Sequence, residues 1–245
     1  MPTQPLFLQV ALNGDRVHPA APRTPEQMAA EAWAAVAAGA QSVHFHPYDP
    51  VGRQTLEAEE CARAIRAVRT VCAGIPISLS TSAAIEGNPQ KRLRLIASWV
   101  ELPDLVTANQ GEEGILEVCE LLLSRGVGIE AGLLSVRDAH LFVASGLAPR
   151  CRRVLIEPLN ADPVDAVRDA EAMERIVMEA GIKREQVHHG EGIASWAVNR
   201  RAVTRGYGIR TGLEDTPVLP DGQPAAGNAE LVAAAATIIA QTAPE

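Results

Sequence analysis

The chain has 245 residues, a net charge of −8 and a hydrophobic fraction of 47%. This apolar content excludes a disordered chain, and the length fits one large α/β domain. The acidic balance and an aromatic content of only 3% argue against a nucleic-acid-binding or anionic-membrane surface. No signal peptide is recognisable, and no apolar run approaches the roughly 20 residues that span a bilayer. We therefore expect a soluble cytoplasmic protein without nucleic-acid or membrane partners.

Eight short apolar runs alternate with eight longer Ala- and Leu-rich segments along the chain. The short runs have the length and β-branched content of strands, and the longer segments have helical spacing. The predicted strands are Leu6–Leu12, Ser42–His46, Pro76–Ser80, Leu105–Asn109, Gly128–Leu133, Arg153–Pro158, Gln186–His189 and Gly208–Leu213. The predicted helices are Thr24–Gly39, Leu56–Val71, Pro89–Trp99, Gly114–Ser124, Ser135–Ser145, Pro163–Ala180, Ser195–Arg205 and Asn228–Gln241.

This alternation of strands and helices predicts parallel strands joined by crossover helices. Eight such units in 245 residues match the requirements of a (β/α)8 TIM barrel. An open doubly wound sheet is the structural alternative. No linker or composition shift marks a second domain, so residues 1–245 are predicted to form a single (β/α)8 barrel.

Polar side chains gather where the predicted strands end. In a (β/α)8 barrel these ends lie on one rim, and the reactive groups are found there. The polar residues at or near the strand ends are Asn13, Asp15, His44, His46, Ser80, Thr81, Ser82, Asn109, Glu112, Glu130, Glu157, Asn160, His189, Glu191, Glu214 and Asp215. Packing alone does not explain such clustering, which indicates an active site.

The histidine pair and the Glu-Asp pair are the strongest chemical signals. His44 and His46 lie two residues apart on an apolar strand, so both imidazoles point to one side. Two imidazoles and one carboxylate are a common ligand set for a catalytic zinc. Of Glu214 and Asp215, one can bind the metal while the other acts as a base. The alternatives are interior histidines without metal, and a loop carboxylate beside a solvated one.

Two further charged residues lie inside predicted strands. Arg210 precedes Glu214 by four residues and therefore shares its strand face. An interior arginine needs a carboxylate or a substrate anion as its partner, and the alternative is an outward-facing charge. Glu130 also needs a partner inside the barrel, and Arg210 is the partner we expect.

The remaining motifs are less specific. The hydroxyls of Ser80, Thr81 and Ser82 can bind a carboxylate or cap the following turn. Of the two histidines at the end of the seventh strand, His189 is expected to face inward, with packing as the alternative. The four cysteines form no CxxC pair and are predicted to be core residues. No phosphate-binding glycine motif follows a strand.

Several motifs, taken in order, resemble the β-keto acid cleavage enzyme family. They are Thr24-Pro25-Glu26, His44-x-His46, Leu79-Ser80-Thr81, Thr107-x-Asn109-x-Gly111, Arg210-x-Gly212-Leu213-Glu214-Asp215, Pro220-Asp221-Gly222 and Asn228-Ala229-Glu230-Leu231-Val232. The resemblance covers nearly the whole chain, and the motifs at its two ends are specific in combination.

The resemblance implies a zinc-dependent (β/α)8 acyltransferase. Such enzymes react a β-keto acid with acetyl-CoA and give acetoacetate and a new acyl-CoA. It further implies that His44, His46 and Glu214 hold Zn²⁺ or another divalent metal. Asp215 would be the catalytic base, with Arg210 and Glu130 as its electrostatic partners. The residues implied to line the region of the substrate carboxylate are Ser80, Thr81, Ser82 and Asn109.

The chain also departs from the family pattern. It is shorter than typical members between the fourth and seventh strands. Arg16 stands where members can carry an acidic residue in the Asn13-Gly14 loop, and Glu157-Pro158-Leu159-Asn160 replaces a Gly-rich turn. His189 and Glu191 are additions after the seventh strand. These positions contact the substrate in the family, so Asn13, His189 and Glu191 are further substrate-binding candidates.

Two alternative functions stay open from the sequence. One is a metal-dependent aldolase or hydrolase that uses the same barrel without CoA. The other is a non-catalytic metal- or ligand-binding barrel, which would have a closed metal sphere and no base nearby. A homo-oligomer is expected from the Ala-rich helix surfaces.

Overall fold

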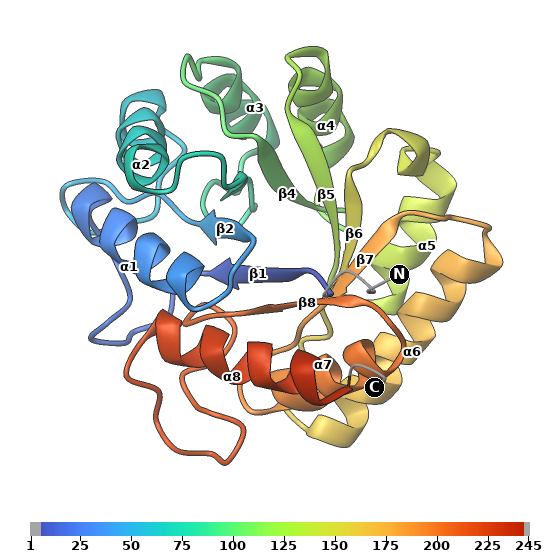
Figure 1. Cartoon of the computed structure of the whole chain (residues 1–245). Helices are drawn as coiled ribbons and strands as arrows, with labels where there is room; N and C mark the ends of the chain where they lie inside the picture. Colours follow the sequence, from blue (N-terminus) through green and yellow to red (C-terminus); the bar gives the residue numbers. More distant parts are fainter. Residues whose placement is uncertain (1–5, 243–245) are drawn as a thin grey trace.

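A computed structural model describes residues 6–242, which form a closed barrel of eight parallel strands surrounded by helices (Figure 1). The strands are β1 (Leu8–Ala11), β2 (Ser42–Phe45), β3 (Ile77–Ser80), β4 (Leu105–Asn109), β5 (Gly128–Leu133), β6 (Arg153–Ile156), β7 (Glu185–His188) and β8 (Gly208–Thr211). The helices are α1 (Pro25–Ala37), α2 (Ala58–Val71), α3 (Pro89–Ala97), α4 (Ile115–Ser124), α5 (Val136–Ser145), α6 (Pro163–Glu179), α7 (Ala194–Thr204) and α8 (Asn228–Thr242). Residues 1–5 and 243–245 of the predicted single domain lie outside the described residues.

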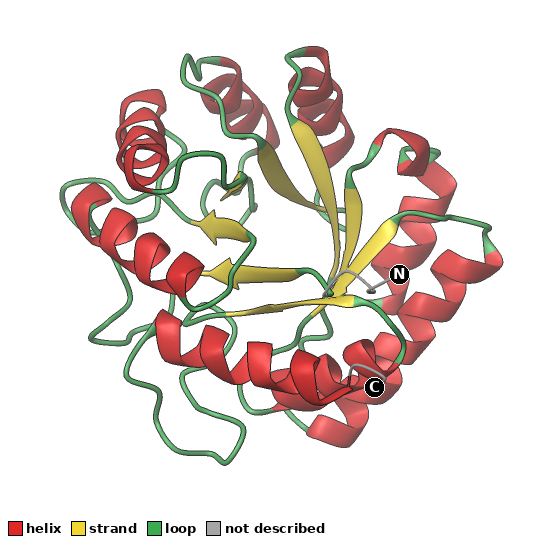
Figure 2. Cartoon of the chain, in the orientation of Figure 1, coloured by secondary structure: helices red, strands yellow, loops and turns green. Residues whose placement is uncertain are grey.

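The strands pair in chain order, and the last strand returns to the first. β8 runs parallel to β1 with Arg210 opposite Gln9, and this pairing closes the sheet. Figure 2 shows the strands at the centre of the molecule with the helices outside them. The predicted (β/α)8 barrel is therefore confirmed, and the open doubly wound sheet is wrong.

Two of the strands that carry the site end earlier than predicted. β2 stops at Phe45 because the backbone amide of His46 donates to Asn13 Oδ1 instead of continuing the strand ladder. β8 stops at Thr211, and the chain turns before Glu214. His46 and Glu214 therefore lie just beyond the strand ends, on the rim of the barrel.

Polar and apolar residues alternate along the strands. The apolar residues Val10, Val43, Ile77, Val106, Ile129, Val154 and Ile209 are buried in the core. A hydrogen bond of 3.0 Å from Gln9 Nε2 on β1 to Glu130 Oε1 on β5 joins two strands four places apart, so the other face points into the barrel. The barrel interior is thus polar, and its groups need partners because water does not reach them.

The helices pack one face against the barrel. Helix α1 begins with a capping box in which Thr24 Oγ1 accepts from the Gln27 amide and the Gln27 side chain accepts from the Thr24 amide. Its buried residues Met28, Ala32 and Ala35 lie at helical spacing. Within residues 6–242, no helix has the length and apolar character needed to cross a membrane.

The four cysteines are all buried and free. They are Cys61, Cys72, Cys119 and Cys151. Burial raises the pKa of each thiol, so none has the thiolate character of a nucleophile. Their prediction as core residues is confirmed.

Gly212, directly after β8, lies against the backbone of Ala11 at the end of β1. Its φ is +152°, and an added Cβ would lie 2.0 Å from the Ala11 carbonyl oxygen. We expect Gly212→Ala to destabilise the fold by about 3 kcal/mol or more, because clash and backbone strain add. Gly222→Ala is the control, since Gly222 has a φ of +86° but no atom within 4 Å of the added Cβ. The free energy of unfolding of both variants is measured by chemical denaturation. An equal loss in Gly212→Ala and Gly222→Ala would contradict the close contact.

Candidate active site

Three residues proposed as metal ligands converge on the rim. The Nε2 atoms of His44 and His46 lie 3.6 and 3.5 Å from Glu214 Oε2. Their potential ligand atoms all lie within 4.8 Å of one another. Strand β1 is the only strand between β2 and β8 in the closed barrel, so segments 170 residues apart meet there.

The other ring nitrogen of each histidine is already engaged. His44 Nδ1 lies 3.1 Å from Ser78 Oγ on β3, and His46 Nδ1 lies 2.8 Å from Gln54 Oε1 in the loop before α2. Both Nε2 atoms are therefore the ones presented to Glu214. Sequence reasoning missed Ser78 and Gln54. Only Ser78 could have been found from the sequence, because it lies two residues before Ser80 and therefore on the same face of the strand.

The electrostatics of this cluster suit a divalent cation. Burial lowers the pKa of His44 to about 3, so its imidazole is neutral. Burial also opposes protonation of His46, but the Glu214 carboxylate outweighs it and raises the pKa of His46. Although burial disfavours the charged form of Glu214, Arg210 and both histidines hold its pKa well below the usual range.

One atom of the cluster lacks a partner. Glu214 Oε2 is buried and accepts no hydrogen bond from the described residues. A cation between this oxygen and the two Nε2 atoms would satisfy all three. Two imidazoles and one carboxylate with an open position are the donor set of catalytic zinc sites. The residues present therefore fit such a metal.

A buried carboxylate–arginine pair lies beside the candidate metal ligands. Arg210 donates to Asp215 through Nη2 at 2.6 Å and Nε at 3.2 Å, and its Nη2 lies 3.1 Å from Glu214 Oε1. Burial alone would raise the pKa of Asp215, but the arginine outweighs it and lowers that pKa. The expectation that an interior Arg210 pairs with a carboxylate is confirmed.

His189 lies between two acidic residues, as its predicted inward orientation requires. Its Nδ1 is 3.4 Å from Asp215 Oδ1, and its Nε2 is 3.4 Å from Glu157 Oε2. Burial raises the pKa of Glu157, whose Oε1 also lies 3.6 Å from Arg210. Glu157, His189 and Asp215 form a second group with metal-binding spacing. Both oxygens of Asp215 already accept from Arg210, whereas Glu214 Oε2 accepts no hydrogen bond from the described residues, so the group with His44 fits a metal better.

Glu130 does not contact Arg210 among the described residues, so that expected pairing is wrong. The Glu130 carboxylate accepts from Gln9 Nε2 at 3.0 Å and from Ser78 Oγ at 2.5 Å, and lies 3.6 Å from Arg153 Nε. Glu130 is paired in register with Arg153 on β6, whereas Arg210 reaches the acidic residues of the rim. The contacts of Glu130 are thus with Gln9, Ser78 and Arg153, and they do not support its implied role as an electrostatic partner of Asp215.

The predicted substrate-binding residues at the ends of β3 and β4 form hydrogen bonds mainly within the protein. Thr81 Oγ1 donates to a backbone carbonyl of β4 at 2.8 Å, and Ser80 Oγ accepts from the Ser82 amide at 3.3 Å. Ser82 Oγ and Asn109 Nδ2 both donate to Glu112 Oε1, at 3.1 and 3.0 Å. These contacts fit the turn-capping alternative, and binding of the substrate carboxylate by these residues stays a prediction.

Asn13 is a structural link between the first loop and β2. Its Nδ2 donates to the carbonyl oxygens of Pro22 and His46, at 3.0 and 2.9 Å. Its Oδ1 accepts from the amides of Gly14 and His46, at 2.8 and 2.9 Å. Because the backbone uses both ends of this side chain, Asn13 positions His46 instead of facing the substrate.

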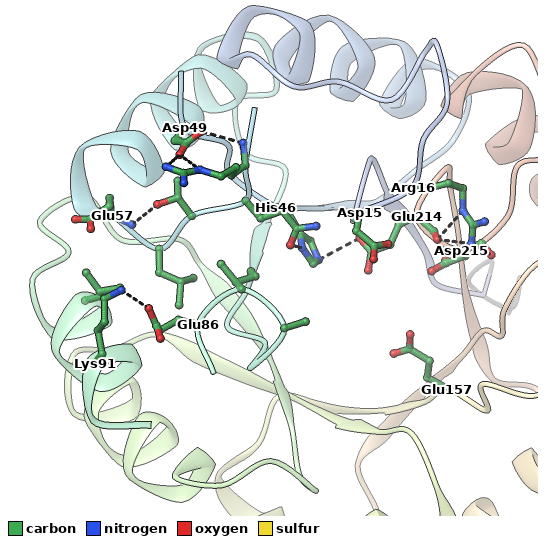
Figure 3. Close-up of a pocket in the computed structure, with 18 of the residues that line it drawn as sticks. Asp15, Arg16, His46, Asp49, Glu57, Glu86, Lys91, Glu157, Glu214 and Asp215 are labelled. Atoms are coloured by element: carbon green, nitrogen blue, oxygen red, sulfur yellow. Dashed lines mark hydrogen bonds and ion pairs between the residues drawn. The ribbon is translucent and has the colours of Figure 1, made fainter. Parts of the chain in front are cut away.

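A cavity of about 970 Å³ opens beside the candidate ligands. Figure 3 shows His46 directed toward Glu214 at its wall. The acidic lining residues are Asp15, Asp49, Glu57, Glu86, Glu157, Glu191, Glu214 and Asp215, and the basic ones are Arg16, Arg53 and Lys91. Each of these basic residues forms an ion pair with an acidic residue of the same lining. The pairs are Arg16 with the predicted site residue Glu191, Arg53 with Asp49, and Lys91 with Glu86. The cavity therefore carries excess negative charge.

The fold and the site define a (β/α)8 barrel whose C-terminal rim carries a candidate divalent-metal site beside a buried carboxylate–arginine pair. Residues 5–245 match the family model described as beta-keto acid cleavage enzyme. The chain belongs to the β-keto acid cleavage enzyme family, as the resemblance implied.

Two curated relatives share the name 3-keto-5-aminohexanoate cleavage enzyme. The protein from Fusobacterium nucleatum subsp. nucleatum is 27% identical over 244 residues, which cover 93% of this chain and 88% of the relative. The protein from Acetoanaerobium sticklandii is 24% identical, with 93% and 89% covered. Both alignments thus extend over most of each chain.

A solved structure shares the fold. It is the ternary complex of ObcA with a C4-CoA adduct and oxalate, with a TM-score of 0.68 and 19% sequence identity. The match covers 88% of this chain and 63% of ObcA, so the chain spans less than two thirds of that protein. At this identity the likeness supports the barrel fold alone.

Proposed function

We propose that this protein is a zinc-dependent acyltransferase that reacts a β-keto acid with acetyl-CoA, giving acetoacetate and a new acyl-CoA. The observation that carries the proposal is the cluster of His44, His46 and Glu214 beside the Asp215–Arg210 pair at one cavity. Membership of the β-keto acid cleavage family supports the reaction class. The CoA adduct named for the ObcA complex supports a CoA thioester as co-substrate.

The proposed first step is removal of a proton from the carbon between the keto and carboxylate groups. His44, His46 and Glu214 would hold the metal, and zinc would supply a Lewis acid that polarises the keto oxygen. Asp215 takes the proton as the general base. The two hydrogen bonds from Arg210 keep the Asp215 carboxylate ionised and fix its orientation.

The remaining steps exchange the acyl groups. The deprotonated carbon attacks the acetyl-CoA carbonyl, forming a carbon–carbon bond and releasing the CoA thiolate. The thiolate then attacks the original keto carbon, and the bond between that carbon and the deprotonated one breaks. Acetoacetate leaves after the proton returns from Asp215, so the reaction consumes no external oxidant or reductant.

The charge of the cavity favours one kind of substrate tail. Its acidic lining residues outnumber the basic ones, and each basic residue is paired. Asp15 forms no ion pair among the described residues, so it remains available to a cationic group at the far end of a substrate. We therefore propose a β-keto acid with an amino or uncharged tail, which agrees with the amino acid substrate in the name of the two relatives.

The proposals for the cellular location and the assembly of the protein rest on sequence expectations only. We propose that it acts in the cytoplasm as a homo-oligomer. Size-exclusion chromatography with light scattering would measure the number of subunits.

The experiment is a substrate panel with the zinc-loaded protein. The panel contains 3-keto-5-aminohexanoate, a β-keto acid with an uncharged tail and a β-keto dicarboxylate, each with acetyl-CoA. Mass spectrometry should find a new acyl-CoA and acetoacetate, with the amino substrate turned over faster than the dicarboxylate. Loss of the keto acid without acetyl-CoA consumption would favour the aldolase or hydrolase alternative. Zinc binding without any turnover would favour the non-catalytic barrel.

A further inference from the structure

A chain of hydrogen bonds leads from a candidate metal ligand into the barrel core. His44 Nδ1 lies 3.1 Å from Ser78 Oγ, and Ser78 Oγ lies 2.5 Å from Glu130 Oε2. The His44 ring is 1% exposed, and Ser78 and Glu130 are fully buried. Neither Ser78 nor Glu130 lines the cavity described above, so direct contact with a substrate there does not explain them.

Glu130 is itself held firmly in place. Gln9 Nε2 donates to Glu130 Oε1 across the barrel at 3.0 Å, and Arg153 Nε lies 3.6 Å from the same oxygen. Ser78 is paired in register with His44 on neighbouring strands, so their side chains share the inward face. The carboxylate therefore lies at a fixed position behind the histidine.

The chemistry of the three groups gives the chain of bonds a direction. A carboxylate only accepts hydrogen bonds, so the single hydroxyl proton of Ser78 is donated to Glu130. Ser78 Oγ then accepts from His44, which places the ring proton on Nδ1. The lone pair is left on Nε2, the nitrogen that faces Glu214.

We infer that Glu130 and Ser78 are positioning residues for the metal site, which select the His44 tautomer able to bind a cation through Nε2. The inference rests on the metal site of the proposed function. It replaces the expected partnership of Glu130 with Arg210 by a partnership with His44. Groups behind a ligating histidine typically change metal affinity 10–100-fold when they are mutated.

One neighbouring hydroxyl can share this role. Thr107 Oγ1 lies 3.4 Å from His44 Nδ1 and 3.5 Å from Glu130 Oε2. A variant without the Ser78 hydroxyl can therefore keep part of the preference for the His44 ring proton on Nδ1. Glu130→Gln acts on both hydroxyls, because a glutamine amide can donate to Ser78 and turn its proton toward His44.

The first measurement is the zinc affinity of the folded protein, by competition with a chromophoric chelator. Glu130→Gln is expected to bind zinc about 10–100-fold more weakly than the wild-type chain. Ser78→Ala is expected to lose less affinity, because Thr107 Oγ1 still lies 3.4 Å from His44 Nδ1. Ser42→Ala is the matched control, because Ser42 is a buried serine two residues before His44. Its hydroxyl donates to the Pro76 carbonyl at 3.1 Å and accepts only a long hydrogen bond of 3.4 Å from Gln9 Nε2. This control variant should bind zinc within about twofold of the wild type, since the Ser42 hydroxyl does not contact the His44 ring.

The second measurement reads the tautomer without metal. Long-range ¹H–¹⁵N spectra of the zinc-free protein should show the His44 proton on Nδ1 in the wild type and partly on Nε2 in Glu130→Gln. Thermal unfolding of the zinc-free variants checks that they are folded, since Glu130→Gln also removes a charge facing Arg153. A purely structural role for Glu130 would leave the tautomer unchanged.

The outcomes separate this inference from the proposed function. Wild-type zinc affinity in both Ser78→Ala and Glu130→Gln, or an equal loss in Ser42→Ala, would overturn the inference alone. A folded wild-type chain that binds no zinc after reconstitution would overturn the metal site and the inference together.

Discussion

Asp215→Asn is expected to lower kcat by about 10²–10⁴-fold, the range typical of a lost general base. Asparagine keeps the shape of the side chain and can still accept from Arg210, but it cannot take the substrate proton. Glu214 and Glu157 remain beside the arginine, so its charge stays compensated. The zinc content should not change, because Asp215 is not among the proposed ligands.

Asp104→Asn is the matched control for this substitution. Asp104 precedes β4, at the end of the barrel opposite the site, and Oδ2 accepts from the Ile77 amide at 2.9 Å. Steady-state rates and metal analysis of both variants give the comparison. Wild-type kcat in Asp215→Asn, or loss of its zinc in parallel with activity, would argue against the role of a base.

His46→Ala should remove both the metal and most of the activity. The metal content is expected to fall from about one zinc per chain to well below that value after dialysis. A metal that polarises a carbonyl contributes several kcal/mol, so kcat/KM should fall about 10³-fold or more. His46 is a better choice than His44 because it is 9% exposed and lies outside the strand, which limits the damage to packing.

His18→Ala provides the control for a lost imidazole. His18 lies in the loop before α1, where its Nδ1 accepts from the Ala20 amide at 3.1 Å. This variant should keep its zinc and its activity. Full zinc occupancy in His46→Ala would remove this histidine from the ligand set.

The fold was predictable because its signals are local. The short β-branched apolar runs, with helical segments between them, were enough to indicate eight parallel units. The convergence of His44 and His46 with Glu214 followed from counting strands, since ends of parallel strands lie on one rim. The pairing of Arg210 with Asp215, which lie near one strand end, was implied by the family resemblance.

The contacts inside the barrel were not predictable in the same way. Glu130 meets Gln9 from a strand four places away, and such contacts depend on strand tilt and register, which the sequence pattern does not report. Asn13 looked like a rim residue, but the turn after β1 directs its side chain to backbone groups. Gln54 reaches His46 through the fold of a loop, for which no periodicity exists.

The most direct test of the proposed reaction is to follow the acetyl carbons of acetyl-CoA labelled with ¹³C at both positions. Acyl exchange predicts that both labelled carbons appear in acetoacetate, at the keto and methyl positions, while the new acyl-CoA carries none. Label that stays in acetyl-CoA while the β-keto acid disappears, or that enters the new acyl-CoA, would contradict the proposed function.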